Sequence, residues 1–300
     1  MIAKEQESAP RPGSLLAKAA LGALPLPGLG RRGKELPDTE LVLPEVRVDA
    51  DHLAAYARVC GFRIRDELPV TYPHVLAFPL ALQLMADGSF PFPMIGLVHV
   101  DNMITQHRSL RLDEPFGLRV RTADLRPHDK GRQFDVIHEA TVDGEVVWRD
   151  VSTYLRRSGS GSGGGSGGSG GGQGGRGGGQ DRPAEEQPPP TAVWRIADDV
   201  GRRYAAVSGD RNPIHLHALT ARAFGFPRAI AHGMWTKARC VAALESRLPA
   251  AYTVDVAFKL PVLLPAKSAF TATPSDGGWR FTLRDARSGK PHLNGAINPT

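Results

Sequence analysis

Residues 204–215 read Tyr-Ala-Ala-Val-Ser-Gly-Asp-Arg-Asn-Pro-Ile-His, and residues 56–61 read Tyr-Ala-Arg-Val-Cys-Gly. In both places an acidic turn, at Asp49–Asp51 or at Asp198–Asp199, precedes a short helical pattern that ends at glycine. Acidic residues at the start of a helix and glycine at its end are typical boundary signals. This internal similarity predicts a chain built from two related halves.

Each half continues with an apolar helical pattern, Val75–Met85 or Met234–Leu248, and then with runs of β-branched and apolar residues separated by turns such as Asp143-Gly144. The predicted strands are Leu97–Thr105, Leu118–Leu125, Phe134–Val142 and Val146–Leu155, then Val254–Leu260, Ser268–Thr273, Trp279–Asp285 and Pro291–Ile297. The order predicts an α+β fold of two antiparallel sheets, each wrapped around one helix. Pro261 and Pro265 predict a bend or a sheet edge between two strands, whose apolar residues line a cavity.

The two halves are separated by a segment of biased composition. Residues 158–179 are almost purely Gly and Ser, and residues 180–190 are charged and rich in proline, which predicts a flexible linker at 158–190. The predicted organisation is an N-terminal arm at 1–35, a first unit at 36–157 and a second unit at 191–300. Ser14–Leu26 is apolar, but it is broken by proline and too short to span a bilayer, so we expect an arm packed on the body.

Composition limits the classes of partner. The formal net charge is +6, but the basic residues are scattered without a Lys/Arg-rich block, which disfavours a nucleic-acid partner and favours a phosphate-bearing small molecule. Cys60 and Cys240 have neither disulfide nor metal-ligand spacing. We expect two buried, unpaired thiols and a reducing, cytoplasmic location.

Two polar strings in the second half carry a family resemblance. Ser208–His215 (SGDRNPIH) resembles the hydratase-2 signature of MaoC-like dehydratases, and Phe226–Met234 (FPRAIAHGM) resembles that family's approach to its central helix. The first half resembles the degenerate N-terminal unit of the actinobacterial two-domain members. The resemblance implies a double hot dog fold and reversible syn hydration or dehydration between trans-2-enoyl and (R)-3-hydroxyacyl thioesters in fatty-acid metabolism.

The residue types fit this chemistry. Hydration of an enoyl thioester needs a base for water, an acid for the α-carbon and a donor to the enolate-like oxygen. Asp210 and His215 divide the first two tasks if Pro213 prevents a regular helix between them, and Asn212 fixes that turn. Gly233 begins the helical pattern, where its N–H and the helix dipole favour negative charge.

The remaining predictions concern the substrate. We expect Arg211, Arg228, His232 and Lys259 to bind it, with the acyl group carried on coenzyme A or on the phosphopantetheine of an acyl carrier protein. No dinucleotide or Walker motif is present, so no further cofactor is expected. His215, His217, His232 and Asp210 lack the spacing of a zinc site, and no metal is predicted.

In the first half, Phe62 and Glu67 take the places of Asp210 and His215, which predicts one active site per chain. We expect Val75–Met85, which contains Pro79, to be displaced or shortened to widen a tunnel for the acyl tail. Two alternatives stay open: a hot-dog thioesterase, although the second helical pattern offers only Glu245 as a carboxylate, and a non-catalytic acyl-thioester-binding subunit. The chain is expected to be a monomer or a homodimer.

Overall fold

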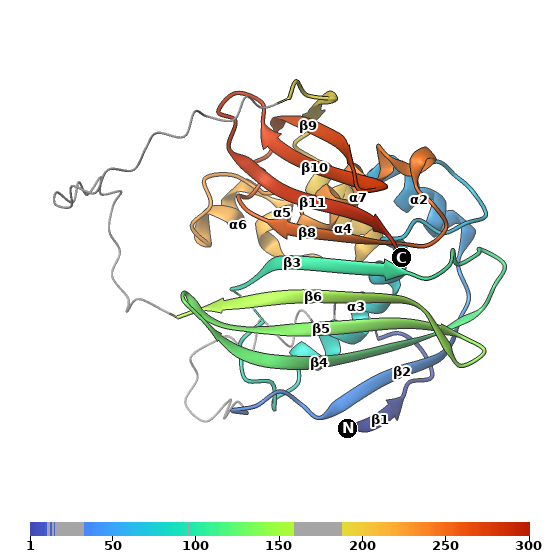
Figure 1. The fold of residues 1–300 in the computed structure, drawn as a ribbon. Helices are drawn as coiled ribbons and strands as arrows, with labels where there is room; N and C mark the ends of the chain where they lie inside the picture. Colours follow the sequence, from blue (N-terminus) through green and yellow to red (C-terminus); the bar gives the residue numbers. More distant parts are fainter. Residues whose placement is uncertain (11–12, 14, 16–32, 95, 159–187) are drawn as a thin grey trace, which may run out of the picture.

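The computed structural model describes residues 1–10, 13, 15, 33–94, 96–158 and 188–300. Its strands form one 11-stranded sheet in the order β1-β2-β4-β5-β6-β3-β8-β11-β10-β9-β7 (Figure 1). The first half contains β1 (Ile2–Glu5), β2 (Thr39–Val46), α2 (Ala50–Cys60), α3 (Tyr72–Met85), β3 (Leu97–Gln106), β4 (Phe116–His128), β5 (Gly131–Val142) and β6 (Glu145–Arg157). The second half contains β7 (Ala192–Ile196), α4 (Val200–Ser208), α5 (Pro213–Leu216), α6 (Ala218–Ala223), α7 (Gly233–Ala242), η1 (Glu245–Arg247), β8 (Tyr252–Phe258), β9 (Ala266–Ser275), β10 (Gly278–Asp285) and β11 (Pro291–Pro299).

The internal similarity of the sequence is confirmed in α2 and α4. Both helices end at a glycine in the left-handed conformation, Gly61 at φ 85° and Gly209 at φ 73°, where residues with a β-carbon are disfavoured. The two helices also pack on each other: a ring nitrogen of His52 lies 2.8 Å from the Val207 carbonyl oxygen. The equivalent helices of the two halves therefore meet at their interface.

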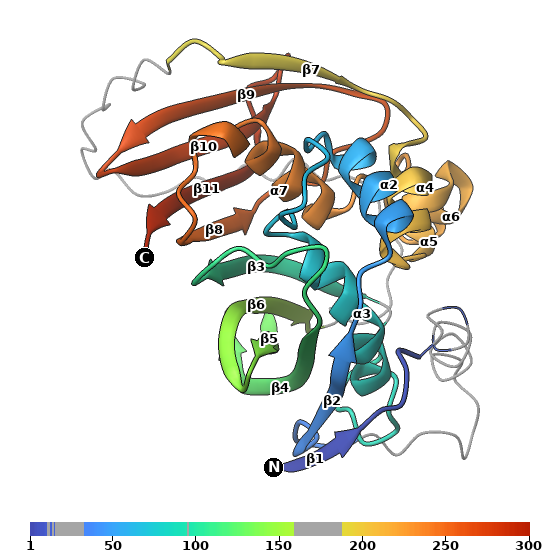
Figure 2. The ribbon, with the colours of Figure 1, turned by 90° about the vertical axis from the view of Figure 1, so that its right-hand side faces the viewer.

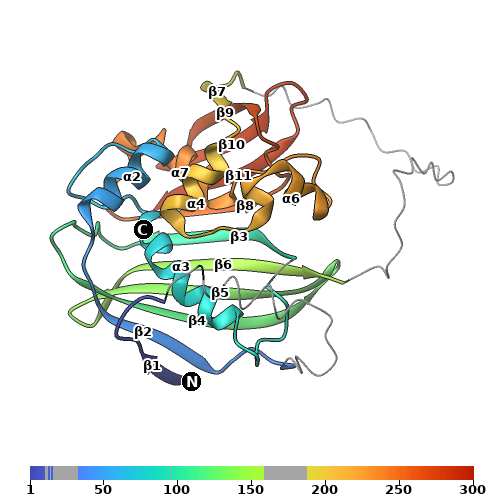
Figure 3. The same cartoon turned by 180° about the vertical axis from the view of Figure 1, so that it is seen from behind.

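The two predicted sheets are continuous. β3 pairs antiparallel with β6 of its own half and with β8 of the other half. The hydroxyl groups of Thr105 and Thr253 lie 2.9 Å apart across this seam. The helices lie on one face of the sheet (Figure 3), and the sheet curves around α3 and α7 (Figure 2). One pair at the edge of the sheet, β1 and β2, is parallel, and β1 lies in the segment predicted as an N-terminal arm.

The predicted shortening of the first-half helix is wrong. α3 has 14 residues and α7 has 10. α3 contains Pro79 but stays helical, because nearly every side chain along it is buried, and burial of that apolar surface outweighs one lost backbone hydrogen bond. The predicted helix Met234–Leu248 is too long. The chain leaves α7 after Ala242, and Leu248 is extended because Pro249 follows it.

Other expectations can be compared only in part. Most of the predicted linker, 159–187, and most of the apolar stretch Ser14–Leu26 lie outside the described residues. Cys60 and Cys240 are both buried and free, as predicted. Among the described helices, none is long and apolar enough to cross a membrane. The segment between Pro261 and Pro265 makes an isolated bridge, between Ile230 and Leu263, as predicted for a bend rather than a regular strand.

Candidate active site

Asp210 lies in the turn between α4 and α5. Its backbone N–H donates to the Ser208 hydroxyl (3.2 Å), and its carboxylate accepts from the Asn212 N–H (3.2 Å). Asn212 in turn is the N-cap of α5, where its side-chain oxygen accepts from the N–H of Ile214 at 3.5 Å. Pro213 starts the short helix α5 instead of preventing one, since the first helical position needs no N–H donor. The turn thus holds the Asp210 carboxylate in place by hydrogen bonds, and the chain continues directly into α5.

His215 and His232 are buried side by side next to this carboxylate. Their rings stack with centroids 3.7 Å apart, and one ligand atom from each of Asp210, His215 and His232 lies within 4.8 Å of the others. Nδ1 of His215 donates to the Ile230 carbonyl (2.8 Å), because a carbonyl oxygen only accepts. In the neutral ring, Nε2 of His215 therefore carries the lone pair and is able to accept a proton. The predicted pair of Asp210 and His215 is brought together.

Burial keeps both imidazoles neutral. Burial lowers the pKa of His215, although the Asp210 carboxylate opposes this. Burial, and then the neighbouring His215, lower the pKa of His232 to about 3. Nε2 of His232 donates to the Asp210 carbonyl oxygen (2.9 Å), so this ring positions the turn that carries the carboxylate. At neutral pH both imidazoles beside Asp210 are therefore uncharged.

Gly233 is the first residue of α7, directly after His232. Its first N–H groups have no partner within the helix, and no side chain among the described residues caps them. A β-carbon on Gly233 would lie 3.1 to 3.3 Å from the Phe258 ring, closer than an ordinary van der Waals contact. The glycine thus leaves a helix N-terminus, which favours negative charge, open beside the two imidazoles.

Comparison with known proteins shows which family this chain belongs to. The model of the MaoC-like domain matches residues 180–294. The 3-hydroxyacyl-thioester dehydratase X of Mycobacterium tuberculosis is 39% identical over 282 residues, which are 94% of this chain and 96% of that protein. The chain belongs to the MaoC-like family.

Solved structures agree with this assignment. The MaoC-like chain is similar to the crystal structure of HtdX from M. tuberculosis, with a TM-score of 0.74 and 38% identity over 87% of this chain and 100% of that one. A MaoC-like dehydratase from Phytophthora capsici (TM-score 0.67, 17% identity, 87% and 95% covered) shares the fold. So does a double hotdog protein of M. tuberculosis (TM-score 0.50, 12% identity, 85% and 94% covered). The predicted double hot dog fold is confirmed.

The first half of the MaoC-like chain also lines the site. The ring of Tyr154 stacks on that of His99, with 4.6 Å between the ring centroids. The His99 ring centroid lies 5.0 Å from that of Phe258, the residue that packs on Gly233. Burial raises the pKa of Tyr154, and the negative charge of Asp210 adds to this. These residues were missed because they occupy ordinary strand positions. Only the sheet brings them near the turn that carries Asp210.

A second buried polar network in this MaoC-like chain was also missed. Asp150 binds His74 (2.5 Å) and accepts from the Asn102 amide (2.6 Å). Asn102 in turn accepts from the Lys237 ammonium at 2.5 Å through its side chain and at 2.9 Å through its backbone. Lys237 lies on α7, the helix that begins at Gly233, so the network joins this helix to β3 and β6.

The other predicted residues lie outside the cluster. Arg211 and Lys259 are exposed, and Arg228 is exposed with a guanidinium N–H donating to the Pro265 carbonyl at 3.3 Å. His217 is exposed as well. The thioesterase alternative receives no support from Glu245, whose carboxylate accepts from the Arg63 N–H at 3.1 Å.

In the first half, the residues aligned with Asp210 and His215 do not reproduce this pair. Phe62 is buried and stacks on Tyr56 (6.3 Å between centroids), while Glu67 is exposed and pairs through its backbone with Arg111. Phe62 offers no acid or base at the position of Asp210, and the Glu67 side chain at the position of His215 is exposed to solvent rather than buried beside a second ionisable group.

Proposed function

We propose that this chain catalyses the reversible hydration of trans-2-enoyl thioesters to (R)-3-hydroxyacyl thioesters. One observation carries the proposal: the Asp210 carboxylate and the neutral His215 imidazole meet beside the open N-terminus of α7. The relative from M. tuberculosis is named a 3-hydroxyacyl-thioester dehydratase, which is the reverse direction of the same reaction.

The groups present supply each step of hydration. Asp210 and His215 hold one water, whose oxygen adds to C3 of the enoyl group while one of the pair takes its proton. The electrons of the double bond move to the thioester oxygen, where the Gly233 N–H and the helix dipole stabilise the negative charge. A proton from the same pair is then delivered to C2 on the same face, so the addition is syn. Dehydration is the reverse.

The acyl tail is assigned to a cavity between the two halves. It has a volume of about 640 Å³ and is lined by Val75, Leu76 and Pro79 of α3 and, next to Asp210, by Ser208 and Gly209. The residues from α3 are apolar, as an acyl chain requires. The substrate arrives as a thioester of coenzyme A or of a carrier protein, and the reaction needs no other cofactor or metal.

The two free, buried thiols support a reducing, cytoplasmic location. Since the two halves already pair within one chain, a monomer is sufficient for activity, and a homodimer is compatible with it.

The test is a hydration assay with purified protein and enoyl-CoA substrates from four to sixteen carbons, with chiral analysis of the product. We expect the (R)-alcohol from the wild type and a loss of turnover on the order of 10²-fold or more in Asp210→Asn and His215→Ala. Wild-type turnover in either variant contradicts the assignment. Release of free thiol instead of hydration indicates a thioesterase, and tight binding without turnover indicates a non-catalytic subunit.

A further inference from the structure

The sheet face that carries the helices is uncovered at one end of three neighbouring strands, β6, β3 and β8. One row of paired residues across these strands is fully buried: Ser152, Asn102 and Val256. Lys237 of α7 binds Asn102 from this side. The next row toward the end of the strands is partly exposed: Tyr154, His99 and Phe258. The three side chains of this second row are therefore accessible to a ligand.

A β-bulge in β3 places His99 in this row. The register between β3 and β6 shifts between His99 and Asp101, so that Asp101 faces Thr153 and His99 faces Tyr154. Without the shift, Val100 would face Tyr154, and His99 would point to the opposite side of the sheet, because side chains alternate along a strand. Bulges that redirect a side chain are frequent next to active sites. The bulge thus brings an imidazole into contact with Tyr154.

The ring of Tyr154 is held between two other rings. It stacks on Phe134 with 5.7 Å between the ring centroids and an angle of 20° between the planes. On its other side it stacks on His99, with 4.6 Å between the centroids and an angle of 18°. Burial, and then the neighbouring His74, lower the pKa of His99 to about 3, so this ring stays uncharged at neutral pH. These contacts fix the direction in which the Tyr154 hydroxyl points.

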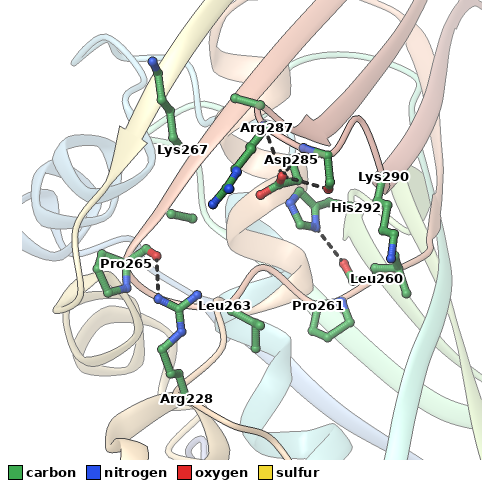
Figure 4. Close-up of a pocket in the computed structure, with 13 residues that line it drawn as sticks. Arg228, Leu260, Pro261, Leu263, Pro265, Lys267, Asp285, Arg287, Lys290 and His292 are labelled. Carbon is green, nitrogen blue, oxygen red and sulfur yellow. Dashed lines mark hydrogen bonds between the residues drawn. The ribbon is translucent and has the colours of Figure 1, made fainter.

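The end of β8 that carries Phe258 is fixed by hydrogen bonds to β11. The Lys259 N–H donates to the His292 carbonyl at 2.8 Å. Nδ1 of His292 donates to the Leu260 carbonyl oxygen at 3.1 Å, as Figure 4 shows. Phe258 therefore keeps its place against Gly233. The exposed row ends beside the helix N-terminus that we assign to the thioester oxygen.

The Tyr154 hydroxyl has no hydrogen-bond partner among the described residues. Burial, and then the negative charge of the nearby Asp210, raise its pKa, so the phenol keeps its proton and can donate it in a hydrogen bond. Such a donor complements the catalytic pair. Asp210 and Nε2 of His215 both accept from the reacting water, and neither of them donates to the oxygen of that water.

We propose that the Tyr154 hydroxyl donates a hydrogen bond to the oxygen that is added to C3, which is the water in hydration and the 3-hydroxyl group in dehydration. This inference rests on the proposed hydratase function and adds a catalytic residue from the first half of the chain. Negative charge builds on this oxygen while its proton passes to Asp210 or His215, and a donor stabilises that charge in the transition state. His99 acts through its stacking as a positioning residue. The same hydrogen bond lets the site recognise ligands with a hydroxyl group at C3.

The test removes one hydroxyl group from the protein and one from the ligand. Tyr154→Phe removes the oxygen and keeps the ring between Phe134 and His99. Tyr252→Phe is the matched control, because Tyr252 lies on β8 and its hydroxyl also lacks a hydrogen-bond partner in the described part of the chain. The ligands are S-[(3R)-3-hydroxybutyl]-CoA and S-butyl-CoA, thioethers without the carbonyl that dehydration requires. Calorimetry gives their dissociation constants. We expect the preference for the hydroxylated ligand to fall about threefold to tenfold in Tyr154→Phe and to stay unchanged in Tyr252→Phe.

Kinetics give a second measurement. For hydration of crotonyl-CoA, kcat/KM should fall about tenfold in Tyr154→Phe, mainly through kcat, and stay unchanged in Tyr252→Phe. An equal preference for the hydroxylated ligand in the wild type and in Tyr154→Phe overturns the proposal. So does a loss of the same size in both variants. If the wild type does not hydrate crotonyl-CoA, the proposed function fails, and the dissociation constants still decide whether Tyr154 recognises the hydroxyl group.

Discussion

Substitution of Gly233 by alanine separates two reasons for a glycine at the start of α7. The added β-carbon would lie 3.1 to 3.3 Å from three atoms of the Phe258 ring, so the ring must retreat by a few tenths of an ångström. The same methyl group projects beside the N–H that we assign to the thioester oxygen. Loss of one oxyanion donor costs about 2.7–4 kcal/mol, or about 10²–10³ in kcat. We expect Gly233→Ala to lower kcat for crotonyl-CoA by about 10²-fold.

The double variant Gly233→Ala/Phe258→Leu is the decisive control, because leucine removes the ring that the new methyl group meets. Overpacking costs about 1–3 kcal/mol, so the free energy of unfolding, measured with urea, should recover in the double variant. The kcat should stay low, since the methyl group still covers the N–H. Phe258→Leu alone supplies the baseline for both quantities. Recovery of kcat in the double variant would show that the glycine serves only to make room for Phe258, and the oxyanion assignment would be refuted.

Three further predictions concern protonation and positioning. Because burial lowers the pKa of His215 and its neutral ring accepts the proton, kcat/KM for hydration should fall on acidification only below about pH 6.5, and an acid limb centred above that value contradicts the assignment. Burial lowers the pKa of Lys237 to about 7, whereas the unfolded lysine keeps its proton up to about 10.5. The unfolded state therefore binds more protons between these values. The free energy of unfolding of the wild type, relative to that of Lys237→Met, should rise with pH by up to about 1.4 kcal/mol per pH unit. If the free energies of unfolding of the two proteins, measured with urea, change in parallel from about pH 7 to 9, this prediction is wrong, and Lys4→Met is the control at an exposed lysine. Asn212→Ala should cost about 1 kcal/mol of stability through the lost cap of α5, with a smaller kcat change than Asp210→Asn, and an equal kcat loss would indicate that Asn212 touches the substrate.

The local parts of the site were predictable because each is encoded in a short stretch of chain. The turn at Asp210, the glycine that ends α4 and the start of α7 at Gly233 all follow from boundary residues and from the family strings. The strand positions followed from β-branched runs, although β1, β2 and β7 were not predicted. The predicted length of the helix Met234–Leu248 was less accurate. Pro249 makes the residue before it extended, and this proline lies outside the apolar pattern from which the helix was predicted.

Contacts between distant segments were not predictable. Tyr154 and His99 approach the site only because β3 and β6 are neighbours in the sheet and β3 pairs with the other half. The same holds for Lys237, a charged residue in an apolar helical pattern, whose partner Asn102 lies 135 residues away in the sequence. The length of α3 was misjudged because Pro79 was given more weight than the burial that surrounds it.

The seam between β3 and β8 has a consequence for association with other molecules. The seam pairs the one edge of each half that faces the other half. In the described sheet, only the two outermost strands, β1 and β7, therefore have a side without a neighbouring strand. An additional strand from any other chain would have to attach at Ile2–Glu5 or at Ala192–Ile196. Both edges are separated from the β3–β8 seam by several strands, so growth of the sheet there would not interrupt the seam.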